Sequence, residues 1–179
     1  MPLPAPVDML WNDLESVRAA LLKEVEGLSQ TQGDWRSSEK DWSVGEIVHH
    51  VTLAEVGTGK VTSKLLREAG EAAKPFPADL KGFAPLVMPP GGPPEAPQAV
   101  WPERGKPLTE LVADLKAARE RSRQTVERLG AVDPRPLIFP HPRLGPLDLA
   151  QWWMLQVRHE GVHLEQLRGV KAEPGFPKA

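Results

Sequence analysis

Apolar residues recur at spacings of three and four along four segments of the chain, which is the period of an amphipathic α-helix. The first segment shows the pattern clearly, with apolar residues at Val7, Leu10, Leu14, Val17 and Leu21. Because these positions share one face of a helix, each segment can bury a stripe against its neighbours. We predict helices over about residues 5–28, 43–69, 108–129 and 148–169.

Two of these segments open with the spacing of a capping box. Ser43 stands three residues before Glu46, and Asp148 stands three residues before Gln151. In such a pair each side chain accepts a hydrogen bond from the other residue's backbone N–H, which marks the start of a helix. No segment alternates apolar and polar residues, and the short apolar run 137–139 is flanked by prolines, so we expect no β-strand.

The connection between the second and third predicted helices is long and rich in proline. Residues 75–107, the crossover, hold ten of the 20 prolines, and such a run cannot lie inside a helix. A connection of this length can cross the whole bundle, so the helices that it joins run parallel, whereas shorter loops join antiparallel neighbours. We therefore predict an all-α fold, an up-down-down-up four-helix bundle, as one domain over residues 1–179. We expect the crossover to pack along the bundle through Phe76, Phe83, Val87 and Trp101.

Composition restricts the function classes. The chain has 22 Lys and Arg against 24 Asp and Glu, so it carries no general attraction for nucleic acid or for an anionic membrane. It has no cysteine, which excludes disulfides, thiolate zinc sites and a cysteine nucleophile. Metal ligands must then be His, Asp or Glu, and any thiol must come from outside. With no signal-peptide pattern and no apolar run long enough to span a bilayer, we expect a cytoplasmic location.

The histidines are the main candidates for chemistry. His159 and His163 lie one helical turn apart, so both can bind one ion, and a helical projection places them among the apolar positions of their helix. His50 lies at the flank of the apolar stripe of its own helix, while His49 is expected to face solvent. Three inward imidazoles would form a metal site with open coordination positions. The alternative is a set of hydrogen-bonded core histidines. His141, in a proline-rich loop, is assigned to solvent.

Residues 159–163 also satisfy the H-E-x-x-H signature of zinc proteases. That hypothesis needs a third ligand downstream, and no suitable residue follows; Gln166 also stands where the extended signature requires glycine. We expect Glu160 to face solvent, with a role in orienting a ligand as the alternative, and it is only a weak catalytic candidate.

Two further residues and one charged run have two interpretations each. Gln166 borders the inward face, so it is either a group beside the metal or a surface glutamine. Trp152 is either a wall of the substrate pocket or a core tryptophan. The charged run at residues 119–123 is expected to be a solvated face, with binding of an anionic substrate as the alternative.

Three motifs resemble those of a known family. They are Trp-Ser-Val-Gly-Glu-Ile-Val-His-His-Val at residues 42–51, His-Pro-Arg-Leu-Gly-Pro-Leu-Asp at 141–148 with Trp152 beyond it, and His-Glu-Gly-Val-His-Leu-Glu-Gln-Leu at 159–167. Together they are similar to the motifs of the DinB-like (DinB/YfiT-type) superfamily of metal-dependent enzymes. The proline-rich crossover departs from the family pattern.

This resemblance implies a four-helix bundle that binds a divalent metal, typically zinc or nickel, through His50, His159 and His163. It also implies a homodimer and a substrate pocket beside the metal. Relatives include S-transferases that use bacillithiol, mycothiol or glutathione, and a mycothiol-dependent maleylpyruvate isomerase.

We therefore expect a metal-dependent enzyme that acts on a small molecule, either a transferase that uses an external low-molecular-weight thiol or a hydrolase. The alternative is a non-enzymatic, metal- or ligand-binding stress-response bundle, followed by a metalloprotease.

Overall fold

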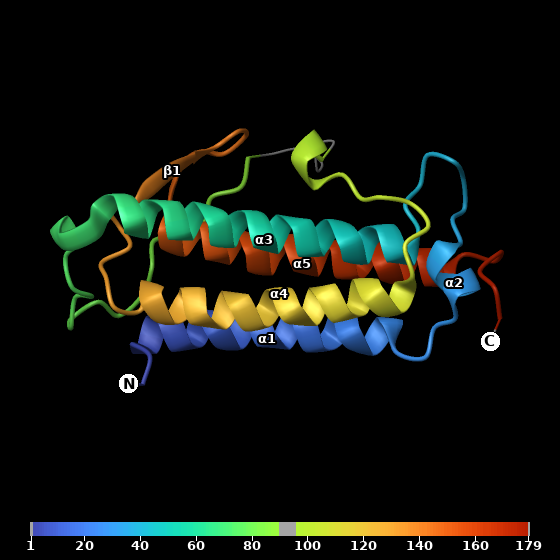
Figure 1. Cartoon of the computed structure of the whole chain (residues 1–179), viewed down its shortest axis with the longest axis horizontal. Helices are drawn as coiled ribbons and strands as arrows, with labels where there is room; N and C mark the ends of the chain where they lie inside the picture. The colour runs from blue at the N-terminus through green and yellow to red at the C-terminus, as the bar shows by residue number, and fades with distance from the viewer. Residues whose placement is uncertain (1, 90–95, 179) are drawn as a thin grey trace.

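Four long helices lie side by side in the computed structural model, which describes residues 2–89 and 96–178 (Figure 1). They are α1 (Ala5–Val25), α3 (Val44–Ala69), α4 (Leu108–Leu129) and α5 (Leu149–Ala172). Both α1 and α3 pack against α4 and α5. In Figure 1, α3 and α4 run in one direction and α1 and α5 in the other, which confirms the predicted up-down-down-up bundle. None of the helices within the described ranges is apolar over a stretch that could cross a membrane.

Both predicted capping boxes are present. The Ser43 hydroxyl accepts from the Glu46 N–H at 3.2 Å, and the Glu46 carboxylate accepts from the Ser43 N–H at 2.8 Å. Asp148 and Gln151 exchange the same two bonds at the start of α5, at 2.8 and 3.0 Å. Each cap contributes about 1 kcal/mol to helix stability, which explains why α3 and α5 begin where the sequence indicates. A short helix, α2 (Gln30–Asp34), was not expected from the periodicity.

The expectation that the chain has no β-strand is wrong. Strands β1 (Ile138–His141) and β2 (Gly145–Asp148) form an antiparallel hairpin that leads directly into α5. Proline is tolerated here because each strand of a two-stranded sheet has an unpaired outer edge, and Pro140 lies opposite Pro146. Residues 142–144 join the two strands, and β2 begins at Gly145, whose φ of +75° is readily adopted by glycine.

The crossover follows the bundle only in part. It contains the short 3₁₀ helix η2 (Gln98–Val100), and another, η1 (Gly70–Ala72), lies between α3 and the crossover. Phe76 and Phe83 pack against the apolar core as expected. Val87 is 79% exposed and Trp101 is 57% exposed, so their predicted packing is wrong. The Trp101 indole instead donates to the Ala96 carbonyl, a contact within the crossover itself. The proline run extends into residues 90–95, which lie outside the described residues.

A layer of charge divides the apolar core into two clusters. It consists of Arg18, Glu55, Arg119 and Glu160, one residue from each long helix, and we call these four residues the charged layer. One apolar cluster lies on either side, the first around Leu21, Ile47, Leu115 and Leu164, and the second around Leu14, Val126, Leu149 and Trp153.

The charged layer corrects two predictions. Glu160 does not face solvent, since its exposed fraction is 0%, and Arg119 and Ser122 of the run 119–123 are buried as well. A helical projection weighs apolar residues alone and does not include opposite charges that neutralise each other across a bundle. The core-facing residues of α5 are Leu149, Ala150, Trp153, Gln156, Glu160, Leu164 and Leu167.

The histidines of α5 consequently flank its buried stripe. His159 and His163 are half-buried, whereas the prediction placed them at the centre of the inward face. Val162, an apolar residue between them, is 44% exposed. The two imidazoles therefore lie at the edge of the bundle, along the junction of α5 with α3.

Candidate metal centre

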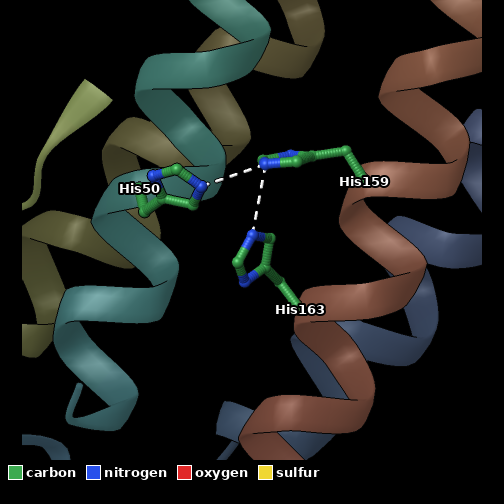
Figure 2. A group of neighbouring side chains, drawn as sticks. All are labelled: His50, His159 and His163. Carbon is green, nitrogen blue, oxygen red and sulfur yellow. Dashed lines mark hydrogen bonds between the residues drawn. The ribbon is translucent and has the colours of Figure 1, made fainter. Parts of the chain in front are cut away.

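Three histidines from two helices converge on one point. His50 comes from α3, and His159 and His163 come from successive turns of α5 (Figure 2). The Nε2 atom of His159 lies 3.0 Å from Nε2 of His50 and 3.1 Å from Nε2 of His163. One ligand atom from each ring lies within 4.8 Å of the other two. The structure thus brings together the three residues that the sequence singled out, which we call the histidine triad.

The outer nitrogens of two rings are held by oxygen acceptors. His50 Nδ1 lies 2.7 Å from the Val100 carbonyl oxygen, and His163 Nδ1 lies 2.7 Å from Oε1 of Gln166. Because a carbonyl oxygen only accepts, each Nδ1 carries the proton, and each Nε2 presents its lone pair to the centre. Nδ1 of His159 is buried and has no hydrogen-bond partner among the described residues.

The triad fits a divalent metal by donor type and spacing. The Nε2 lone pairs of His50 and His163 both face Nε2 of His159, at 3.0 and 3.1 Å. A single proton on His159 Nε2 therefore has to serve both contacts. Metal–nitrogen bonds of about 2.0–2.1 Å place neighbouring ligand nitrogens about 2.8–3.4 Å apart for bond angles between 90° and 109°. The two spacings from His159, to His50 and to His163, lie in that range. Neutral imidazoles suit zinc, nickel, iron and cobalt.

Burial keeps the triad neutral. It lowers the pKa of His50 to about 4 and that of His159 to about 3, with smaller contributions from neighbouring imidazoles. Burial also lowers the pKa of His163, although its bond to Gln166 opposes the shift. Metal ligation requires a free Nε2 lone pair on each neutral imidazole, so at neutral pH no ring has to lose a proton, and only His159 has to move its proton from Nε2 to Nδ1.

An indole lies against the triad. The Trp42 ring centroid is 4.7 Å from that of His50 and 6.0 Å from that of His163, where the two rings stack. Trp42 was quoted only as part of a motif and not as a site residue. Its position one residue before the capping box of α3 was the available signal, because the cap fixes where the preceding residue lies.

The crossover supplies part of the site. His49 was predicted to face solvent but is buried, and its Nδ1 accepts from the Glu103 backbone N–H at 2.9 Å. Together with the bond from His50 to Val100, this contact means that two adjacent histidines of α3 hold η2 and the residues after it. Val100 carried no signal in the sequence, because the group that acts is a backbone carbonyl.

A known protein family matches most of the chain. A model of the DinB superfamily matches residues 13–167, which include the whole triad. The chain belongs to the DinB superfamily. Among solved structures, it is similar to the crystal structure of TT2238, a four-helix bundle protein, with 24% identity and a TM-score of 0.63. That alignment covers 91% of this chain and 98% of TT2238, and it supports the fold alone. No curated protein matches the chain.

The remaining candidates of this DinB-superfamily chain lie around the triad in different roles. Gln166 is exposed, yet its side-chain oxygen holds His163. Trp152 lies two helical turns from His159, and its indole donates to the Phe139 carbonyl of the hairpin at 3.1 Å. His141 is half-buried rather than solvent-facing, and its ring centroid lies 5.2 Å from that of Trp152.

Glu160 belongs to the charged layer of the DinB bundle. Its carboxylate accepts from Arg18 at 2.5 and 3.0 Å and from Arg119 at 2.9 Å. Burial raises the pKa of its carboxyl group, and the two guanidinium groups oppose that shift. A carboxylate held in this way does not suit the general-base role that the H-E-x-x-H signature assigns to it.

Proposed function

We propose that His50, His159 and His163 hold a divalent metal ion, zinc or nickel, and that the protein is a metal-dependent enzyme. The observation that supports this most is the convergence of three Nε2 atoms, two of them oriented by acceptors on the outer nitrogens. Three protein ligands leave further coordination positions open, as catalytic zinc sites do and structural sites do not. Membership of the DinB superfamily is compatible with metal binding.

The reaction we favour is transfer of an external low-molecular-weight thiol to an electrophilic small molecule. When bound, a divalent metal acts as a Lewis acid that lowers the pKa of a coordinated thiol or water. The chain itself has no cysteine, so the thiol has to be a cosubstrate. The protein's own contribution is orientation, through Val100 and Gln166, and exclusion of water on the side that Trp42 covers. Hydrolysis by a coordinated water is the second candidate.

Three further expectations belong to this proposal. A non-enzymatic bundle that binds metal for stability is the main alternative, and the open ligand set argues against it. The position of Glu160 argues against a metalloprotease. A homodimer and a cytoplasmic location stay predictions.

The metal content of the purified protein tests the first part of the proposal, that the triad binds a metal ion. We expect protein purified without a His-tag to retain about one metal ion per chain after dialysis, as three converging imidazoles bind tightly at neutral pH. His50→Ala should fall below about 0.1 ion per chain, whereas the control His141→Ala, with its imidazole on the hairpin, should keep the wild-type content. Wild-type protein that holds no metal after zinc or nickel loading would refute the proposal.

A turnover screen tests the second part of the proposal, that the protein transfers a thiol. The loaded protein is assayed with bacillithiol, mycothiol and glutathione, each paired with an electrophilic acceptor. Metal-dependent consumption of thiol that is lost in His50→Ala supports the transferase. Metal-dependent stabilisation without turnover of thiols or of hydrolysable esters would favour the non-enzymatic alternative.

A further inference from the structure

A second groove for a ligand lies away from the triad. The triad sits at the junction of α3 with α5, whereas this groove runs between α3 and α4 and has a volume of about 620 Å³. That volume is within the usual range of small-molecule sites. The exposed surface of the groove is mostly apolar, and along it lie four cationic residues and three hydroxyl residues: Lys60, Lys64, Arg67, Arg121, Ser63, Ser122 and Thr125.

The positive charge of the groove is largely unbalanced. Lys64 pairs with Glu68 at 2.5 Å. Lys60, Arg67 and Arg121 have no ion-pair partner within residues 2–89 and 96–178. Gathering like charges costs free energy, and here it occurs on a chain whose net charge is −2. A bound anion would offset that cost.

The one acid that lines the groove is already neutralised. Glu55 lies at the groove and is fully buried, and its carboxylate accepts from Arg18 at 2.5 Å and from Arg119 at 2.9 Å. Burial opposes ionisation of Glu55, but the two guanidinium groups hold the pKa of its carboxyl below the usual value. The negative charge of Glu55 is therefore neutralised by Arg18 and Arg119 inside the charged layer and does not balance Lys60 or Arg121.

A comparable groove elsewhere on the bundle is close to neutral. It is lined by residues of α1 and α4, has a volume of about 510 Å³, and carries Lys23 and Lys116 together with Glu26. The three unpaired cations of the first groove thus exceed the net charge of +1 in the second groove by two units. The cations of the first groove are a local feature and not a property of the whole surface.

We propose that the groove between α3 and α4 binds a small molecule that carries a multiply charged anionic group, such as a phosphate. The guanidinium groups of Arg67 and Arg121 offer forked donors for such a group, and Lys60 adds a compact charge. The Ser63 hydroxyl lines the same groove and supplies a neutral donor. This site is separate from the triad, and it does not depend on the proposed metal.

Calorimetric titration with pyrophosphate at low salt tests the proposal. We expect saturable binding of one anion per chain, weakened at least about tenfold in Lys60→Gln/Arg121→Gln, because each charged contact is a strong hydrogen bond. The control Lys23→Gln/Lys116→Gln removes the same formal charge from the other groove and should change the affinity by less than about twofold. Citrate, titrated separately, shows whether a polycarboxylate or a phosphate binds more tightly, and tighter binding of either by the wild type than by the groove variant supports the site.

Four outcomes would overturn the proposal. The wild type could show no saturable binding of either anion, or the two double variants could lose affinity equally, as general charge attraction predicts. Loss of binding in His50→Ala would place the anion on a metal at the triad. Binding of a single-stranded oligonucleotide without binding of pyrophosphate would assign the surface to nucleic acid. Unfolding curves of all variants are recorded alongside, and the exposed substitutions should leave them unchanged.

Discussion

The histidine triad and the charged layer are both polar groups shared by α3 and α5, and they lie close along the chain, with Glu160 next to His159. They differ in how completely their hydrogen bonds are satisfied. In the charged layer, Arg18 and Arg119 each donate from all three of their side-chain nitrogens, to two carboxylates and to the Leu115 and Leu14 carbonyls. In the triad, lone pairs converge on one another and one outer nitrogen has no partner.

Charge shows the same difference. Two arginines and two glutamates sum to zero, so the layer is complete without any further group. The triad consists of neutral rings held by outer acceptors, and its centre needs a cation or a proton. A buried polar cluster that is fully paired is structural, whereas one that is oriented from outside but incomplete inside points to a ligand.

Removing a member of the charged layer should have the largest effect. We expect Glu160→Ala to lower the free energy of unfolding by about 3–5 kcal/mol, because it leaves two buried guanidinium groups without one of their carboxylates. Urea unfolding of the metal-free protein measures this. The control is Glu15→Ala, which removes an exposed carboxylate from the same Arg119 and should cost at most about 1 kcal/mol. Equal losses in the two variants would contradict a structural role for the layer.

Removing a member of the triad should change the response to metal and not the fold. At one hundred times its dissociation constant, zinc should stabilise the wild type by about 2.7 kcal/mol, and His159→Ala should abolish this gain. Thermal melts with and without zinc provide the measurement. Arg158→Ala, at the exposed neighbouring position, should keep the response. A zinc response that survives in His159→Ala would show that the ion binds elsewhere.

Acid should destabilise the metal-free protein through the triad first. The pKa values of His50 and His159 are lowered from 6.5 to about 4 and about 3, so below pH 6.5 the unfolded chain binds protons that the folded chain does not. Stability is therefore full above pH 6.5 and falls by about 1.4 kcal/mol per pH unit for each such histidine as the pH decreases toward 5. Urea unfolding at several pH values measures the slope, which should be shallower in His50→Gln/His159→Gln. An unchanged slope in that variant would contradict the assignment.

Removing Gln166, the outer hydrogen-bond partner of His163, should have the smallest effect. Gln166→Ala should weaken zinc binding about tenfold, since loss of an outer hydrogen bond frees the His163 ring to turn. Competition with a chromophoric chelator measures the affinity. Gln124→Ala, a surface glutamine of α4, serves as the control. Affinity unchanged by Gln166→Ala would mean that the glutamine does not orient the ring.

The fold could be predicted because its signals are local. Helical periodicity, the capping boxes at Ser43 and Asp148, and the length of the crossover determine four helices and their directions. The hairpin was missed because proline is excluded only from paired strand edges, and the sequence does not show which edges are paired. Val87 and Trp101 were misplaced because apolar character alone does not determine where an irregular segment packs.

The candidate site was predictable where a ligand residue has a recognisable position on its own helix. The pair His159 and His163 is visible from spacing, and His50 from its flank position. The contribution of Val100 depends on a contact between residues 50 positions apart, and the burial of Glu160 depends on Arg119 and Arg18, which are 41 and 142 positions away. No local pattern encodes these contacts. The prediction placed Glu160 in solvent and the histidines at the centre of the buried face. These two errors have one cause, because the charged layer rotates α5 so that Glu160 faces the core and the histidines flank it.

The charged layer also determines how the helices are aligned along the bundle axis. Sliding α5 along α3 by one turn, about 5.4 Å, would separate Glu160 from both of its arginines. The same slip would move His159 out of reach of His50, since the two residues of α5 are adjacent. Apolar clusters tolerate small offsets, whereas this set of ion pairs has one alignment that satisfies it. The spacing of the three imidazoles is thus set by the ion pairs inside the bundle, which a ligand at the triad does not alter.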